Sequence, residues 1–190
     1  MNNNTAIKKK LRENLLRKRE KLTRIEVAER SKKVFENFQK AFKGESFQGI
    51  TIAACYSPIN NEVDVLSILN LLHQKRIIVA LPKMVKKELK FYEWNEGQPL
   101  ICNRFSIKEP ADEKEVSPNL LIIPLLGFDK HGNRLGYGFG YYDKTLSKLP
   151  QTKKIGVGYS FQQVENVPLE SHDVKLDLII TDNAIIKVNQ

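Results

Sequence analysis

Five short apolar runs limit the possible folds of this 190-residue chain more than any other feature. Each run has four to seven consecutive residues, mostly Ile, Val, Leu and Ala. Continuous hydrophobicity of this kind is typical of strands that are buried on both faces, as in a parallel sheet covered by helices. The runs occupy residues 50–56, 77–81, 120–123, 155–159 and 178–181, and we expect each to be a core strand.

Segments between these runs carry apolar residues at helical spacing. Residues 63–72 and 141–149 are of this kind, so strand, helix and strand follow one another as in a parallel crossover unit. Residues 89–94 alternate like an edge strand, and the charged, Pro-containing stretch 109–118 indicates a loop. We therefore expect residues 1–190 to form a single three-layer α/β/α domain, Rossmann-like, with a mostly parallel sheet.

The positive charge of the chain is confined to its first quarter. The net charge is +9, and residues 1–43 contain 14 Lys or Arg against five Asp or Glu. The other residues carry 17 of each sign, and so no net charge. Such an excess suits a basic arm that binds nucleic acid or an anionic membrane, or a helix whose cations serve an anionic small-molecule site.

The basic quarter also has the pattern of two helices with a usable core face. Ile7, Leu11 and Leu15 form one apolar stripe, and Thr23 with Glu26 makes a capping box in front of a second helix. The Phe residues of the second helix recur at core spacing, unlike the exposed aromatic residues that nucleic-acid-binding proteins interleave with their cations. We expect both helices to pack on the α/β core, which argues against a nucleic-acid-binding arm.

Composition argues against several other classes. No stretch approaches the roughly 20 apolar residues that span a bilayer, and the N-terminus lacks the apolar segment of a secretory signal. Cys55 and Cys102 are far apart in the chain, so neither a disulfide framework nor a zinc site is expected. We expect a cytoplasmic monomer with reduced cysteines and with neither a membrane nor a nucleic acid as partner.

The loop after residue 123 holds the strongest candidate site. Ligands of such sheets bind at the carboxyl ends of the strands. Here Arg134 precedes glycines at every second position, Gly136, Gly138 and Gly140, and a helix follows. The glycines let a ligand approach the backbone, and the helix N-terminus offers free N–H groups to an anion, so we expect a phosphate or polyphosphate. The alternative is a Gly-rich turn that only connects a strand to a helix.

A long motif covers residues 127–143, and its pattern G-F-D-x-x-G-x-R-L-G-x-G-x-G-Y-Y-D resembles the signature of 5-formyltetrahydrofolate cyclo-ligases. The resemblance extends over nearly the whole chain. It includes Lys8 and Arg12, Asn-Glu-Val-Asp at 61–64, and V-P-x-x-x-x-D-x-x-x-D at 167–177. It implies a single α/β/α domain that uses ATP and Mg²⁺ to convert 5-formyltetrahydrofolate to 5,10-methenyltetrahydrofolate, with release of ADP and phosphate.

The resemblance also implies an ATP site built from two segments. Lys8 and Arg12 lie four residues apart, so both can reach one ligand from the same helix face. The implied ATP-binding residues are Lys8, Lys9, Lys10, Leu11, Arg12, Arg134, Leu135, Gly136, Tyr137, Gly138, Phe139, Gly140, Tyr141 and Tyr142. Phe139 departs from the family, which often has Gly or Lys there, so a lysine's contribution to phosphate binding is absent. For most other cations nearby, a solvated charged face is the simpler interpretation.

Further site residues follow from the same resemblance. They are Asp143 and Asp173 as Mg²⁺ ligands, Arg134, Tyr141 and Tyr142 as catalytic residues, and Glu62 and Tyr141 as substrate contacts. On chemical grounds alone we add Tyr56 as an aromatic wall for a flat pterin. Simpler alternatives exist: Asp143 and Glu62 can be acids in the first turn of a helix, and the tyrosines can be core residues.

The resemblance suggests that the γ-phosphate phosphorylates the formyl oxygen and that N10 then attacks and expels phosphate. This chemistry needs no strong nucleophile, in agreement with a sequence that lacks a Ser-His-Asp or Cys-His pattern. The expected partners are ATP, Mg²⁺ and 5-formyltetrahydrofolate, with or without a polyglutamate tail. An ATP-dependent enzyme with another acyl substrate on the same scaffold is the alternative.

Overall fold

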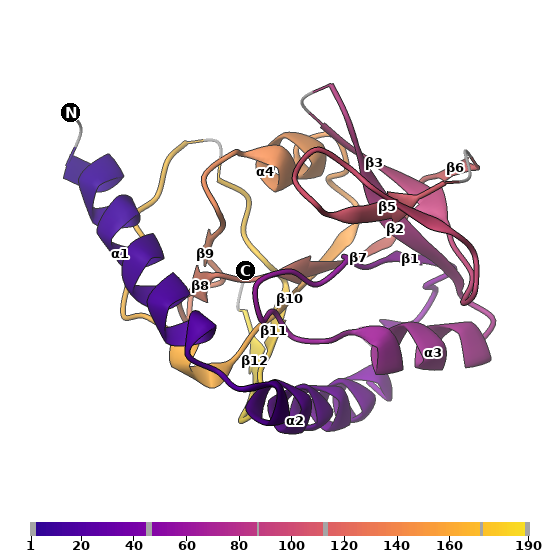
Figure 1. Cartoon of the computed structure of the whole chain (residues 1–190), viewed down its shortest axis with the longest axis horizontal. Coiled ribbons are helices and arrows are strands. Elements are labelled where there is room, and N and C mark those ends of the chain that lie inside the picture. Colours follow the sequence, from indigo (N-terminus) through magenta and orange to yellow (C-terminus); the bar gives the residue numbers. More distant parts are fainter. Residues whose placement is uncertain (1–2, 45–46, 87, 112–113, 172, 189–190) are drawn as a thin grey trace.

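An eight-stranded sheet runs through the middle of the computed structural model, which describes residues 3–44, 47–86, 88–111, 114–171 and 173–188 (Figure 1). The strand order is β12-β11-β10-β7-β1-β2-β3-β6. The strands are β1 (Ile52–Ala54), β2 (Ile78–Val85), β3 (Glu88–Glu93), β6 (Glu115–Val116), β7 (Leu120–Pro124), β10 (Lys153–Val157), β11 (Leu178–Ile180) and β12 (Ile185–Lys187). Each of the five apolar runs supplies one of these strands.

The five central strands are parallel, as the apolar runs predict. Ala53 of β1 pairs with Val79 on one side and with Leu120 on the other, and β10 pairs in parallel with both β7 and β11. In chain order the parallel strands have the spatial order 2-1-3-4-5, a common order of doubly wound sheets. The strands β3, β6 and β12 are antiparallel additions. The predicted mostly parallel sheet is therefore confirmed.

Two details of the sheet differ from the prediction. The strand over residues 89–94 is not the edge, because the two-residue β6 pairs with it. The strand β2 does not stop before Pro82 but continues to Val85. Beyond Ala80, β2 pairs only with β3, so proline's missing N–H costs no hydrogen bond to β1.

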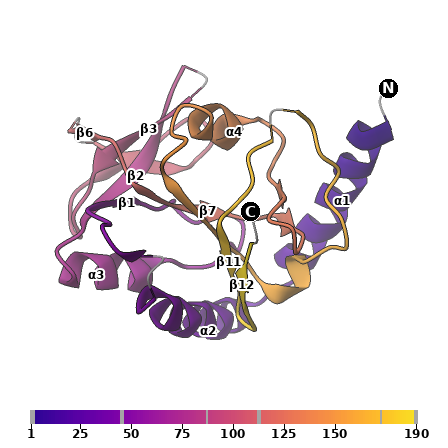
Figure 2. The ribbon, with the colours of Figure 1, turned by 180° about the vertical axis from the view of Figure 1, so that it is seen from behind.

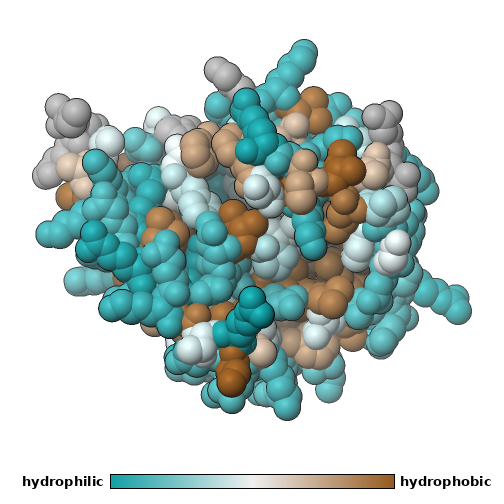
Figure 3. All heavy atoms as spheres, viewed as in Figure 1, coloured by the Kyte–Doolittle hydropathy of each residue, from teal (hydrophilic) through white to brown (hydrophobic). Residues whose placement is uncertain are grey.

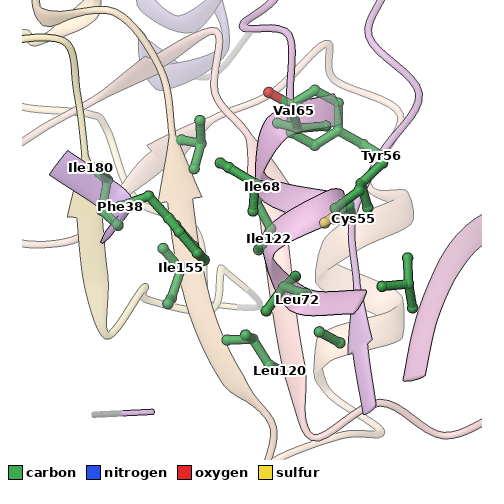
Figure 4. Packing of buried hydrophobic residues seen from close by; sticks show 14 of the residues in the cluster. Phe38, Cys55, Tyr56, Val65, Ile68, Leu72, Leu120, Ile122, Ile155 and Ile180 are labelled. Carbon is green, nitrogen blue, oxygen red and sulfur yellow. The ribbon is translucent and has the colours of Figure 1, made fainter. Parts of the chain in front are cut away.

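Helices cover both faces of the sheet, but unequally (Figures 1 and 2). The helices α2 (Arg24–Phe42) and α3 (Leu66–Gln74) cover one face, where Phe38, Ile68 and Leu72 join the core with Leu120 and Ile122 (Figure 4). The other face carries the six-residue α4 (Tyr141–Leu146) and irregular segments. The predicted three-layer α/β/α architecture is confirmed, with a thin second helical layer.

The helix α2 begins where its capping box predicts. The Thr23 hydroxyl accepts a hydrogen bond from the Glu26 backbone N–H at 3.2 Å, and the Thr23 N–H donates to the Glu26 carboxylate at 2.8 Å. The backbone N–H groups of Thr23 and Glu26, which have no acceptor within the helix, are thereby satisfied.

The helix α1 (Asn3–Glu20) lies at one end of the molecule, away from α2 (Figure 1). Its Leu15 packs with Leu126, Leu135 and Val167 in a small cluster of its own, while Ile7 is 42% exposed. The expected apolar stripe is therefore only partly buried, and the apolar contact between this helix and the rest of the molecule is small.

The sequence patterns did not predict several short elements. They are the hairpins β4–β5 (Leu100–Cys102, Lys108–Pro110) and β8–β9 (Gly127–Phe128, Arg134–Leu135), and the 3₁₀ turn η2 (Ser160–Gln162). The prediction of a loop over 109–118 was wrong where β5 and β6 lie, because strands of two or three residues are too short to show periodicity. Cys55 is buried and Cys102 exposed, and both are free. Within the described ranges, no helix is both long and apolar enough to cross a bilayer.

Candidate functional site

A cavity of about 390 Å³ opens at the carboxyl ends of the parallel strands. Tyr56 follows β1 and Pro124 ends β7, and both line it. The strands β1 and β7 are neighbours, but the chain leaves them toward opposite sides of the sheet, which is the usual position of a ligand crevice in doubly wound folds. On the face of the molecule that Figure 3 shows, hydrophilic residues cover α1 on the left, and hydrophobic residues gather in the middle and on the right.

The helix α1 contributes cations to one end of the cavity. Lys8 and Arg12 line it together, as their i, i+4 spacing predicts. The Lys8 ammonium lies 2.8 Å from a Glu170 carboxylate oxygen and 3.0 Å from one of Asp173. Burial alone would lower the pKa of Lys8, but these two carboxylates outweigh it and hold the pKa above its usual value.

Three neighbours on α1 lie elsewhere. Lys9 and Lys10 are exposed and do not line the cavity, and the half-buried Leu11 packs on the small cluster around Leu15. Helical geometry explains the positions of Lys9 and Lys10, because residues one or two positions after Lys8 point to other faces of the helix.

The segment 136–140, which we call the Gly loop, closes over Arg12. The Arg12 Nε donates to the Gly136 carbonyl at 2.9 Å. Gly138 has φ +97°, and a Cβ there would lie 3.1 Å from the Arg12 guanidinium carbon. Gly138 is therefore required both by its backbone conformation and by the close approach of Arg12. Gly140, at φ +69°, begins α4 without a side-chain cap.

Arg134 and Asp143 form an ion pair at the same end of the cavity. Arg134 also donates to the Val174 carbonyl, and burial is the main cause that lowers its pKa. Asp143 and Asp173, the two expected metal ligands, both line the cavity, and each contacts a cation. In the part of the chain that the structure describes, no group of three His, Cys, Asp or Glu side chains is placed to hold a metal ion.

A buried polar network around Glu62 also borders the cavity. Glu62 is 5% exposed; its Oε1 accepts from the Tyr137 hydroxyl at 3.1 Å and its Oε2 from the Ile59 N–H at 3.1 Å. Arg19, only 1% exposed, lies 3.7 Å from Glu62 Oε1 and donates to the Tyr137 hydroxyl. Burial raises the pKa of Glu62, while Arg19 and the hydrogen bonds oppose this rise.

Arg19 is the main residue that the sequence interpretation missed. Most cations near the N-terminus were interpreted as a solvated face. Yet Arg19 lies seven residues after Arg12 and four after Leu15, so helical periodicity puts it on their face. That spacing is the signal that would have found it.

Aromatic side chains complete the lining. Tyr56 donates to the Val63 carbonyl at 2.9 Å, so its hydroxyl holds the following turn while its ring faces the cavity. The rings of Phe105 and Tyr141 lie 6.2 Å and 6.1 Å from that of Phe139, which is 64% exposed. Tyr142 also lines the cavity, and removal from water raises its pKa.

The opening of the long motif has a structural role. Asp129 is 1% exposed and accepts hydrogen bonds from the N–H groups of His131, Asn133 and Val167 and from the Asn133 side chain, at 2.9 to 3.1 Å. The carboxylate thus folds the β8–β9 turn that presents Arg134 to the cavity. It is not available to a ligand.

Known proteins resemble this chain in sequence and in architecture. The model of the 5-formyltetrahydrofolate cyclo-ligase family matches residues 4–182. The 5-formyltetrahydrofolate cyclo-ligase of Haemophilus influenzae is 31% identical over 93% of this chain and 99% of its own length. That of Mycoplasma pneumoniae is 33% identical over 92% and 98%.

Two solved structures are also similar. One is the 5,10-methenyltetrahydrofolate synthetase of Mycoplasma pneumoniae, with a TM-score of 0.75 and 31% identity over 92% of this chain and 98% of that one. The other is the same enzyme from Aquifex aeolicus, with a TM-score of 0.82 and 31% identity over 97% and 94%. By sequence and by structure, this chain belongs to the 5-formyltetrahydrofolate cyclo-ligase family, a family of ligase enzymes.

Proposed function

We propose that this chain converts 5-formyltetrahydrofolate to 5,10-methenyltetrahydrofolate with consumption of ATP and with Mg²⁺. One observation carries the proposal: a single cavity is lined by three cations and also by a buried carboxylate, together with the Gly loop and several aromatic rings. The cations suit a polyanion, and the carboxylate with the rings suits a flat, hydrogen-bonding heterocycle. We also propose that residues 1–190 act as one cytoplasmic, monomeric domain.

The three cations would bind the triphosphate. Lys8, Arg12 and Arg134 come from two distant parts of the chain and line the same cavity. Because each already contacts a carboxylate or a carbonyl, the side chains are held in place before the nucleotide arrives. Such preorganised cations stabilise charge that develops on phosphate during transfer.

Asp143 and Asp173 would hold Mg²⁺ together with phosphate oxygens and water. Their chemistry fits, since Mg²⁺ is usually bound through one or two carboxylates and substrate phosphates. When bound there, the cation would neutralise part of the triphosphate charge. Lys8 and Arg134 contact these carboxylates and would therefore lie next to the phosphates that share the cation.

The carboxylate and the aromatic rings would bind the folate. Glu62 lines the cavity, and each of its carboxylate oxygens can accept a second hydrogen bond, so it suits an N–H donor of a pterin. Tyr56, Tyr141 and Tyr142 would flank the ring and the formyl group.

The proposed reaction has two steps. The formyl oxygen attacks the γ-phosphorus, a new O–P bond forms, and ADP leaves. N10 then attacks the activated formyl carbon, loses its proton, and phosphate leaves as the ring closes. Arg134 would compensate the charge on the transferring phosphoryl group, and the tyrosines would orient the formyl group and exclude water.

The direct test uses purified protein with 5-formyltetrahydrofolate, Mg²⁺ and ATP. We expect the methenyl absorbance to appear only when ATP is present. A folded protein that gives no signal would contradict the proposal, and a panel of other formyl compounds would then test the alternative acyl substrate.

A second test addresses the metal. Asp143→Asn keeps an oxygen acceptor for Arg134 but removes the charge, so we expect lower turnover and a higher Mg²⁺ requirement with a nearly unchanged melting temperature. Asp177→Asn is the matched control: Asp177 contacts Lys154 and does not line the cavity, so the Mg²⁺ requirement should stay the same. Equal Mg²⁺ requirements in both variants would refute the role of Asp143.

A further inference from the structure

The Tyr137 hydroxyl connects the Gly loop to Glu62. Tyr137 belongs to the Gly loop, between the two glycines that close over Arg12. Its hydroxyl accepts from Arg19 and donates to Glu62 Oε1 at 3.1 Å. The Arg19 guanidinium also lies over the Tyr137 ring, 5.6 Å from its centre. The side chain therefore has contacts at both its polar and its aromatic parts.

Arg19 anchors this connection in the body of the protein. Its Nε donates to the Asn60 carbonyl at 2.9 Å and a terminal nitrogen to the Leu125 carbonyl at 3.4 Å. A guanidinium has five N–H donors and no acceptor, and at 1% exposure water cannot replace a lost partner. The turn before Glu62, the end of β7 and the Gly loop are thus held by one buried side chain.

The carboxylate that Tyr137 contacts can also accept a hydrogen bond from a ligand. Glu62 Oε1 accepts from the Tyr137 hydroxyl and Oε2 accepts from the Ile59 N–H, each at 3.1 Å. A carboxylate oxygen has two lone pairs, so each oxygen can accept one more hydrogen bond. A ligand that donates to Glu62 therefore shares the carboxylate with the hydroxyl of the Gly loop.

We propose that Tyr137 is a positioning residue that couples binding at Glu62 to binding at the Gly loop. The inference rests on the function proposed above. A folate that fixes Glu62 also fixes the Tyr137 hydroxyl, and with it the backbone of the loop that contacts Arg12. A nucleotide that binds to the ordered loop loses less conformational entropy, so each ligand raises the affinity for the other by the same factor.

The test measures that factor. The dissociation constant of a nonhydrolysable ATP analogue with Mg²⁺ is determined with and without saturating tetrahydrofolate, which lacks the formyl group and cannot react. We expect a ratio of about five or more in the natural protein. In Tyr137→Phe, which removes only the hydroxyl, the ratio should fall to about one.

Two further variants make the result specific. Tyr92→Phe removes a hydroxyl on β3 outside the cavity and should keep the natural ratio. Glu62→Gln should lower the ratio by itself, and adding Tyr137→Phe to it should change the ratio no further. Thermal unfolding of each variant shows that it is folded, and Glu62→Gln supplies the test if Tyr137→Phe is not.

The outcomes separate the inference from the function on which it rests. If Tyr137→Phe weakens both ligands equally and keeps the ratio, the hydroxyl is only structural and the inference is overturned. If both ligands bind the natural protein independently, the inference fails while the proposed function stands. If neither ligand binds the natural protein, both fail.

Discussion

The first two helices are similar in sequence but bury different kinds of side chain. Both are basic, and both have apolar residues at helical spacing. The helix α2 buries Ser31, Val34 and Phe38, and its two apolar side chains belong to the main core. The buried residues of α1 are Lys8, Leu15 and Arg19, two of which are cations.

This difference shows how one kind of helix can serve stability and another a site. The apolar face of α2 packs on the sheet, and most of its cations are exposed; Arg30, which pairs with Asp182, is half-buried. The helix α1 makes only a small apolar contact, and its inward face carries the charges that line or support the cavity. The buried cations of α1 agree with the binding role that we propose for them, and their carboxylate and carbonyl partners make the burial tolerable.

The largest expected effect concerns the core face of α2. Phe38→Ala removes a fully buried ring that contacts Phe42 and Phe47, so the free energy of unfolding should fall by about 3 to 5 kcal/mol. Urea unfolding measures this, and the KM values of the folded fraction should not change. A large rise of KM without loss of stability would contradict the division between the helices.

The next effect concerns the cavity face of α1. Arg12→Gln removes the charge that we propose contacts the triphosphate, and the guanidinium that donates to Gly136, so the KM for ATP should rise about 10- to 100-fold, the equivalent of one charge-assisted hydrogen bond. Steady-state kinetics measure it. Arg24→Gln, an exposed cation of α2, is the control and should leave KM unchanged. Similar changes in both variants would mean that net charge alone attracts the nucleotide.

A smaller effect is expected at the start of α2. Thr23→Ala removes the capping hydroxyl and should lower the free energy of unfolding by about 1 kcal/mol. Thr5→Ala, an exposed position near the start of α1, should change it by less than about 0.5 kcal/mol. Chemical denaturation of both variants sharpens the comparison, and equal losses would show that α1 is as important for stability as α2.

The smallest effect is the pH dependence of stability. Hydrogen bonds to Thr23 lower the pKa of Glu26 below 4.5, so its contribution is present above that pH and is lost as pH falls through the folded-state pKa. Burial instead raises the pKa of Glu62 above 4.5. The folded state then binds the proton more tightly than the unfolded state, so stability falls as pH rises from 4.5 to the raised value.

Two variants separate these contributions in denaturation series at several pH values. Glu26→Gln should remove the loss of stability on the acid side, and Glu62→Gln should remove the decline on the other side of pH 4.5. Curves that stay parallel to that of the natural protein would refute the assigned pKa directions.

Much of the fold and part of the candidate site follow from local patterns. Five continuous apolar runs predict the parallel strands, and the Thr23 capping box predicts where α2 begins. Lys8 and Arg12 are brought to the cavity as their spacing predicts. The short hairpins were missed because their strands are held by backbone hydrogen bonds and by side chains such as Asp129, which leave no periodicity.

The sequence by itself determined the five core strands and the helices between them, the Gly loop, and the family to which this chain belongs. These depend on the identity and spacing of neighbouring residues. Only the tertiary structure decided which of the 14 N-terminal cations face inward and what they contact. Arg19 meets Glu62 and Tyr137 across 43 and 118 residues of chain. Such partners are selected by packing, because a buried charge is tolerated only where distant segments supply its acceptors.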